Sequence, residues 1–204
     1  MLKNKIQRIA YSALILLTGC ASYNASTLSM LPQETAIQSK QDSNVLVSWK
    51  AFDKEDCKTY LDRDVISEGY VPVQVTIRNN SNDPMYFSPT NFSTPVSSPD
   101  EVAYKVHTST GGRIAAWGIG GLIFFPLLIP AVVDGVGSAN ANDALDADYA
   151  AKTLKEHTIQ PNSLFNGVVF IPQQYAEEKI EMFLVNMKTN KKVAFSEIPL
   201  DQRS

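Results

Sequence analysis

The chain has 204 residues, with 18 Lys and Arg against 21 Asp and Glu and a formal net charge of −3. That balance lacks the basic surplus with which proteins neutralise nucleic-acid phosphates, so the composition argues against a nucleic-acid partner. Hydrophobic residues make up 44% of the chain, which is enough for a buried core. The length suits one compact domain with an insertion.

The N-terminus combines a basic start, a short apolar stretch and a cysteine. Lys3, Lys5 and Arg8 supply the charge, and residues 9–17 supply an apolar core that is too short to span a bilayer. The stretch closes with Leu17-Thr18-Gly19-Cys20, which resembles the lipobox of bacterial lipoprotein precursors. Because the lipoprotein signal peptidase needs small residues before a cysteine, the resemblance implies cleavage after residue 19.

The same resemblance implies a signal peptide over residues 1–19 and an acylated N-terminus at Cys20. Two or more acyl chains anchor a protein stably, because each buried methylene contributes about 0.8 kcal/mol. In enterobacterial lipoproteins an Asp after the lipidated cysteine favours the inner membrane, and this chain has Ala21 there. The implied location is the periplasmic leaflet of the outer membrane. The alternatives are an uncleaved signal anchor and a chance cysteine after an ordinary signal peptide.

Residues 20–43 are rich in Ser, Thr, Asn and Gln and show no sustained apolar period, which predicts a flexible tether. From Val45 onward, apolar and polar residues alternate, which is typical of half-buried strands. Turn residues over 79–84 predict that the flanking strands form a hairpin. The strands are expected at residues 45–51, 70–78, 85–88, 102–106, 165–171, 179–187 and 192–198. Together they predict a mainly β fold, an antiparallel β-sandwich over 44–198 with a tail over 199–204.

Two segments resemble the immunoglobulin-like domains of bacterial envelope lipoproteins. The first is the strand over residues 71–77, followed by Asn79-Asn80-Ser81 and an aromatic pair. The second is Ile159-Gln160-Pro161, which leads into the strand over 167–170. The resemblance implies an immunoglobulin-like β-sandwich with a binding or structural role, and it names no ligand.

Residues 115–133 carry no charged side chain and interrupt the series of strands. As one helix this run would be about 28 Å long, close to the thickness of a bilayer core. A single crossing, however, would place the strands before 107 and after 157 on opposite sides of the membrane. We therefore expect an apolar helical insertion over 112–156 that lies in the membrane interface, packs on a partner chain or folds back on its own domain. The candidate contact residues are Trp117, Leu122, Phe124, Phe125 and Leu128.

The second arm of the insertion is polar. Asn142 or Asp143 is expected to cap a helix that runs to about Lys155, with Leu145, Tyr149 and Leu154 as a weak apolar stripe. Three acidic residues crowd the first turns of that helix, where the helix dipole stabilises negative charge without a metal ion. They are Asp143, Asp146 and Asp148.

The chain shows no recognisable catalytic motif. His107 and His157 are its only histidines, and neither belongs to a known nucleophile or zinc motif. Cys57 is the only cysteine besides Cys20, and we expect it to be a small buried residue. The acidic residues around it are expected to form a solvated loop face, with a cation site as the weaker alternative. These residues are Asp53, Glu55, Asp56, Asp62 and Asp64.

The sequence therefore predicts a non-enzymatic outer-membrane lipoprotein that acts as a structural or interaction component of the cell envelope. Its expected partners are the membrane, through the lipid anchor, and other envelope proteins, with copies of itself among the candidates. The alternative is a membrane-active lipoprotein whose insertion over 115–133 binds or perturbs lipid. No cofactor or metal is expected in either case.

Overall fold

The structure is a computed structural model of the whole chain, and it describes residues 22–39, 44–108, 128–176 and 179–199. Side chains are not described over 128–138 and 196–199. The described elements are η1 (Gln33–Thr35), β1 (Ile37–Gln38), β2 (Val45–Ala51), α2 (Lys54–Asp56), η2 (Cys57–Leu61), β3 (Tyr70–Asn79), β4 (Met85–Phe87), η3 (Pro89–Asn91), α3 (Pro99–Val106), α5 (Leu128–Lys152), β5 (His157–Ile159), β6 (Ser163–Pro172), η5 (Gln173–Tyr175), β7 (Lys179–Asn186) and β8 (Lys192–Pro199).

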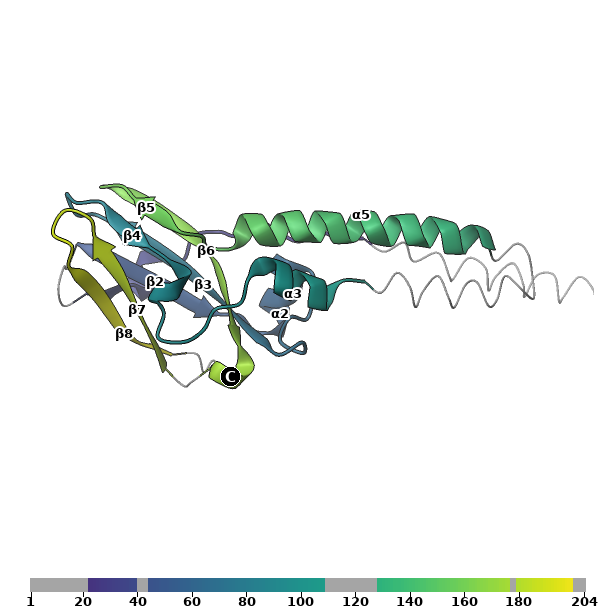
Figure 1. Cartoon of the computed structure of the whole chain (residues 1–204), viewed down its shortest axis with the longest axis horizontal. Coiled ribbons are helices and arrows are strands. Elements are labelled where there is room, and N and C mark those ends of the chain that lie inside the picture. The colour runs from purple at the N-terminus through teal and green to yellow at the C-terminus, as the bar shows by residue number, and fades with distance from the viewer. Residues whose placement is uncertain (1–21, 40–43, 109–127, 177–178, 200–204) are drawn as a thin grey trace, which may run out of the picture. The chain divides into compact units, whose positions relative to one another are not determined.

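The strands form two antiparallel sheets of four strands each, which confirms the mainly β fold expected from the alternating pattern (Figure 1). Sheet A has the order β1-β2-β3-β6, and sheet B has the order β5-β4-β7-β8. One apolar core joins them, because Val73, Val75 and Ile77 of sheet A belong to the same buried cluster as Phe87 and Phe195 of sheet B. Alternation on each strand thus supplies one apolar face per sheet.

The predicted hairpin between residues 70–78 and 85–88 is wrong, because β3 and β4 belong to different sheets. The Asn79 side chain explains the change of sheet. Its Nδ2 donates to the carbonyl oxygens of Asp83 at 2.9 Å and Ile159 at 3.0 Å. These bonds hold the turn over 80–84 against β5, so the chain crosses to sheet B, where β4 pairs with β5 and β7.

The strand expected over residues 102–106 is helix α3. Ser98 caps the helix, with its Oγ accepting from the backbone N–H of Glu101 at 3.2 Å, and Pro99 occupies the first helical position. Val102 and Val106 are both buried, at the spacing of one helix face. The Val-Tyr-Val alternation was too short to distinguish a strand from a helix.

Helix α5 also differs from its expectation, since it begins at Leu128 and not at Asn142. Residues 135–141 are therefore helical, and Asn142 is not an N-cap. Its side chain instead accepts from the N–H of Thr108 at 3.0 Å and donates to the Thr108 carbonyl at 3.3 Å. These two bonds join the ends of the segment 109–141, which leaves and returns at one point.

The chain divides into two compact units. One unit contains Asn24–Val106 and Asp146–Ser204, with both sheets, and the described residues of His107–Leu145 belong to the other. Within the first unit, we call the end that carries α2, η2 and α3 the helical end. The opposite end carries the turns over 80–84 and 187–191, and we call it the turn end.

Candidate functional site

The helical end of the first unit begins with a compact helical pair after β2. Asp53 caps α2, with Oδ1 accepting from the N–H of Asp56 at 2.7 Å, while Asp56 Oδ2 accepts from the N–H of Asp53 at 3.2 Å. Asp56 also binds Lys50 Nζ of β2 at 2.6 Å. Asp53 and Asp56 therefore organise the helix start. Asp56 is buried, whereas Asp53, Glu55 and Asp64 are exposed, as expected of a solvated face.

The next element, η2, is a π-helix that ends at Asp62. Such helices are rare and are frequent at functional sites. Asp62 has the left-handed backbone conformation, with φ of 53°, which an Asp tolerates better than most residues. Its carboxylate binds Arg63 Nη1 at 2.7 Å and accepts from the N–H of Asn24 at 3.1 Å.

Residues 24–32, which fall within the flexible tether expected over 20–43, are bound along the unit. We call residues 24–32 the strap. At the helical end, Ser26 N–H donates to the Thr59 carbonyl at 2.8 Å. Toward the turn end, Leu31 N–H donates to Thr76 Oγ1 at 3.1 Å. The strap is thus fixed to both η2 and sheet A.

The outer face of sheet A is built to receive this strap. Gln74 Nε2 donates to the Ser29 carbonyl at 2.6 Å, and Ser48 Oγ donates to the Pro32 carbonyl at 3.0 Å. Asn166 of β6 completes the set by accepting from Thr76 Oγ1 at 2.7 Å. Polar side chains on β2 and β3 therefore bind the strap backbone, and Ser48, Gln74 and Thr76 are buried as a result.

The end of α5 packs against the other side of η2. Tyr149 OH donates to the Leu61 carbonyl at 3.2 Å, and Lys152 Nζ donates to the Tyr60 carbonyl at 2.7 Å. Tyr149 also stacks on Phe170 of β6, with ring centroids 5.7 Å apart. Burial of Tyr149 and Leu154, expected from the weak apolar stripe, is confirmed, as is burial of Leu145. Asp148 was expected in the first turns of this helix, but it lies well inside α5, where it pairs with Lys152.

Cys57 is buried, as expected for a structural cysteine. Burial raises the pKa of its thiol to about 12, and the neighbouring carboxylates of Asp64, Asp56 and Asp53 add to that rise. Because the thiolate is the nucleophilic form, a thiol with this pKa is inert near neutral pH.

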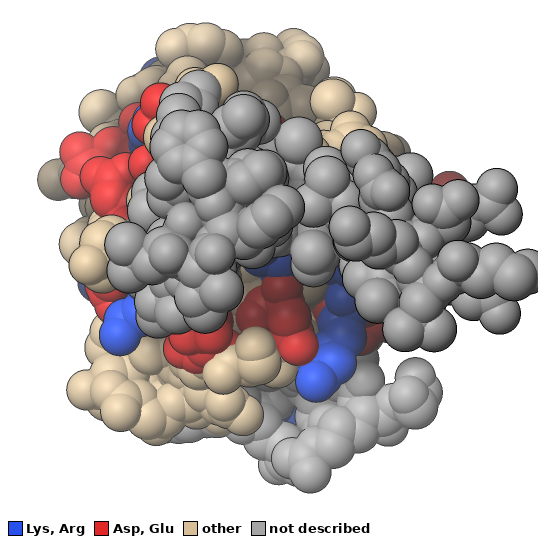
Figure 2. Space-filling view, turned by 90° about the vertical axis from the view of Figure 1, so that its right-hand side faces the viewer, with Lys and Arg blue, Asp and Glu red and all other residues tan. Residues whose placement is uncertain are grey.

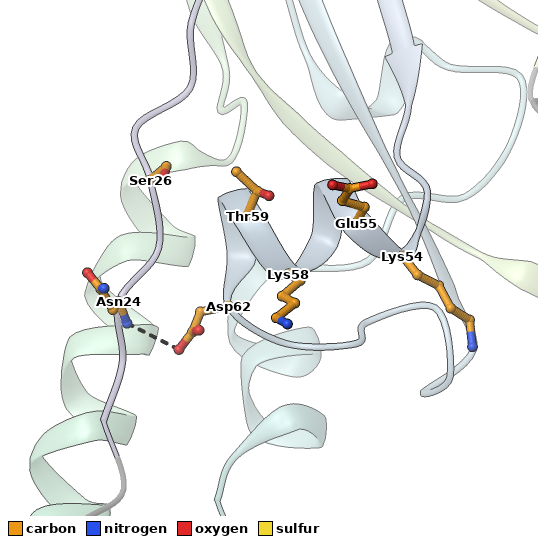
Figure 3. Close-up of a pocket in the computed structure, with 7 residues that line it drawn as sticks. All are labelled: Asn24, Ser26, Lys54, Glu55, Lys58, Thr59 and Asp62. Atoms are coloured by element: carbon orange, nitrogen blue, oxygen red, sulfur yellow. Dashed lines mark hydrogen bonds between the residues drawn. The ribbon is translucent and has the colours of Figure 1, made fainter.

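A shallow cleft of about 720 Å³ opens where the strap meets α2 and η2. Figure 3 shows Asn24 and Ser26 on the strap side and the charged side chains on the helical side. The cleft is lined by Asn24, Ser26, Lys54, Glu55, Lys58, Thr59 and Asp62. Side chains of both signs suit a polar or zwitterionic group, and no histidine or cysteine lines the cleft.

The described residues contain no group of three or more His, Cys, Asp or Glu side chains that could hold a metal ion. His157 stacks on Phe165 at 4.7 Å between ring centroids, away from the residues that line the cleft. Within the same described ranges, no helix has the length and apolar character required to cross a bilayer.

Most of the sequence-predicted site residues lie outside the described part of the chain. These are Cys20, Trp117, Leu122, Phe124 and Phe125, and Leu128 is described only through its backbone at the start of α5. The strap residues Asn24 and Ser26 were missed, because their polar neighbours were interpreted as a tether. The signal that could have found them is the outer face of β3, which carries Gln74 and Thr76 instead of the charged residues usual on a solvated face.

No family model, curated protein or solved structure matches the chain.

Proposed function

We propose that the chain is the precursor of a non-enzymatic outer-membrane lipoprotein, anchored through Cys20 and acting as a structural or interaction component of the cell envelope. The observation that carries the proposal is the lipobox Leu17-Thr18-Gly19-Cys20 after a basic and apolar leader. A contact of the domain that supports the proposal lies close to this cysteine in sequence, since the Asn24 N–H binds the Asp62 carboxylate and only residues 21–23 separate Asn24 from Cys20.

An immunoglobulin-like sandwich is part of this proposal, and the strand order supports it. In such a fold, strands A, B, E and D form one sheet, while C, F and G form the other, with C′ added in variable-type domains. Assigning β2, β3 and β6 to A, B and E and β5, β4, β7 and β8 to C′, C, F and G matches this order, with β1 beside A and no described strand in the place of D. The helical insertion then lies in the connection between C and C′.

The interaction role is supported by the position of the insertion. Strands β4 and β5 pair directly, with Phe87 opposite His157, so the chain between them leaves and re-enters at one edge of sheet B. Residues His107–Leu145 fall outside the unit that contains both sheets. Of the described side chains of the insertion over 112–156, only Leu154 belongs to the core cluster that the two sheets share.

Binding or perturbing lipid is the second candidate function. The strap, α3 and the end of α5 all reach the helical end, since Asn24 binds Asp62, Glu101 binds Tyr70 at 2.8 Å and Tyr149 binds the Leu61 carbonyl. The chain therefore leaves toward Cys20 and toward the apolar run from the same end. This favours an insertion that acts near the membrane that holds the anchor.

Metabolic labelling with a palmitate analogue tests the anchor. We expect label on the wild type and on Cys57→Ala, and none on Cys20→Ser, which should also leave the membrane fraction. Cys57→Ala is the matched control, because it removes the other cysteine of the chain. Equal label on the wild type and Cys20→Ser, or no label on either, would contradict the assignment.

A further inference from the structure

We propose that the helical end of the sandwich unit faces the phospholipid headgroups and that the strap fixes this orientation. The inference rests on the proposed lipid anchor at Cys20 and names the surface that the anchor presents to the membrane. It concerns the face formed by α2 and η2, with the cleft between Asn24, Lys58 and Asp62.

The anchor and the strap are close together in sequence. Asn24 N–H binds the Asp62 carboxylate, and Ser26 N–H binds the Thr59 carbonyl. Only residues 21–23 separate Cys20 from Asn24, and a fully extended chain spans about 3.3–3.6 Å per residue. The Cα atom of the acylated residue therefore lies within about 14 Å of the Cα atom of Asn24.

Detaching the whole strap from the domain would cost considerable free energy. Residues 24–32 are held by bonds from Asp62, Thr59, Gln74, Thr76 and Ser48, which lie on η2 and on two strands. Releasing the strap would break the bonds from Gln74 Nε2 to the Ser29 carbonyl, from Ser48 Oγ to the Pro32 carbonyl and from the Leu31 N–H to Thr76 Oγ1. It would also uncover these three buried side chains. The attachment point stays at the helical end.

The two ends of the unit are far apart. Strand β3 runs from Tyr70 at the helical end to Asn79 at the turn end, and strands rise about 3.3 Å per residue, so the ends are about 30 Å apart. Residues 21–23 are long enough to place the anchor near the helical end and too short to place it near the turn end. The turn over 187–191, held to the turn over 80–84 by Lys188 and Asp83, is then directed away from the bilayer.

Charge is compatible with this orientation but does not create it. Figure 2 views the helical end, and among its coloured residues acidic and basic side chains lie side by side. Lys58 and Asp62 both line the cleft (Figure 3), and Lys54 Nζ lies 3.5 Å from the Asp64 carboxylate. Such a mixed surface suits zwitterionic headgroups, whose amine and phosphate groups complement carboxylates and lysines, more than a strongly anionic membrane.

Fluorophores at the two ends test the orientation in the acylated chain bound to vesicles that contain a nitroxide-headgroup phospholipid. The fluorophore is attached to Lys58→Cys at the helical end or to Thr189→Cys at the turn end, both at exposed positions. The unsubstituted chain is the control for labelling at Cys57, which is buried. We expect at least twofold stronger quenching at position 58 than at position 189.

A flexible Gly-Ser linker inserted between Tyr23 and Asn24 provides the matched variant. The linker lengthens the chain between Cys20 and the strap and leaves every strap contact in place. The variant should therefore keep the acyl label and membrane binding, but quenching at positions 58 and 189 should become equal. Equal quenching in the unmodified acylated chain, or stronger quenching at 189, overturns the orientation alone. A chain without acyl label overturns the anchor as well, so the two failures are distinguishable.

Discussion

Gly167 is a residue whose lack of a side chain is required by a close backbone approach. It lies inside β6, opposite Val75, and a Cβ atom at this position would be 2.6 Å from the Lys152 carbonyl oxygen and 2.8 Å from Leu154 Cδ2. The glycine therefore lets the chain that follows α5 pass directly over the sheet.

Gly167→Ala should destabilise the sandwich, because the carbonyl oxygen belongs to the backbone and cannot move aside as a flexible side chain can. An overpacked contact of this kind costs about 1–3 kcal/mol. Chemical denaturation of the wild type and the variant measures the difference, and an unchanged free energy of unfolding would contradict the close approach. Ser163→Ala, at the start of the same strand, should change stability by less than about 0.5 kcal/mol, since the Ser163 Oγ bond to the Gln160 carbonyl is exposed.

Cys57 should remain unreactive in the folded protein. Its thiol pKa is raised to about 12, so the neutral thiol persists well above pH 8.5, where an ordinary exposed cysteine is half ionised. We expect negligible modification by a maleimide between pH 7 and about pH 9, and complete modification after unfolding. Rapid modification of the folded chain near neutral pH would sink this prediction.

At the scale of elements, the strap and sheet A depend on each other. Thr76 Oγ1 accepts from Leu31 N–H and donates to Asn166, so Thr76→Val removes both bonds and keeps the shape of the side chain. A buried group left unsatisfied costs about 1–3 kcal/mol, which sets the expected loss of stability. The variant should also speed amide exchange at Leu31 and leave exchange at Val75 in the core strand protected. Unchanged protection at Leu31 would show that Thr76 does not hold the strap.

The sequence predicted the strands well where alternation was long. Residues 45–51, 70–78, 165–171 and 192–198 lie in strands, as do residues 179–186 of the strand expected over 179–187. Alternation over as many positions as in 70–78 leaves little ambiguity about the type of element. Val102, Tyr104 and Val106 gave only three positions, and the helix signals at Ser98 and Pro99 decided the element.

Contacts between distant segments could not be read from the sequence. Asn79 changes the sheet of the following strand through a bond to residue 159, and Asn142 binds Thr108, so neither acts through its neighbours in sequence. The strap was missed for the same reason. Its polar side chains do not indicate a bound segment, because the contacts are made by its backbone. The cleft depends on the strap and was missed with it.

At the scale of the whole molecule, we expect the sandwich unit to fold independently of the helical insertion. The two sheets share one core that draws on both, and the described side chains of 107–108 and 139–145 are not part of it. Loop closure costs only slowly increasing entropy with length, so the sandwich should tolerate a change in the insertion. If the insertion instead supplied core packing, its loss would cost several kcal/mol.

The most direct test of this division compares two chains that start at residue 21, one unchanged and one in which Gly118–Val132 are replaced by a short Gly-Ser linker. Thermal melting reports the sandwich, and liposome flotation with size analysis reports lipid binding and association. We predict melting temperatures that agree within a few degrees, and loss of the association or lipid binding that the unchanged chain shows. An unfolded replacement variant, or a folded one that associates and floats as the unchanged chain does, would contradict the account.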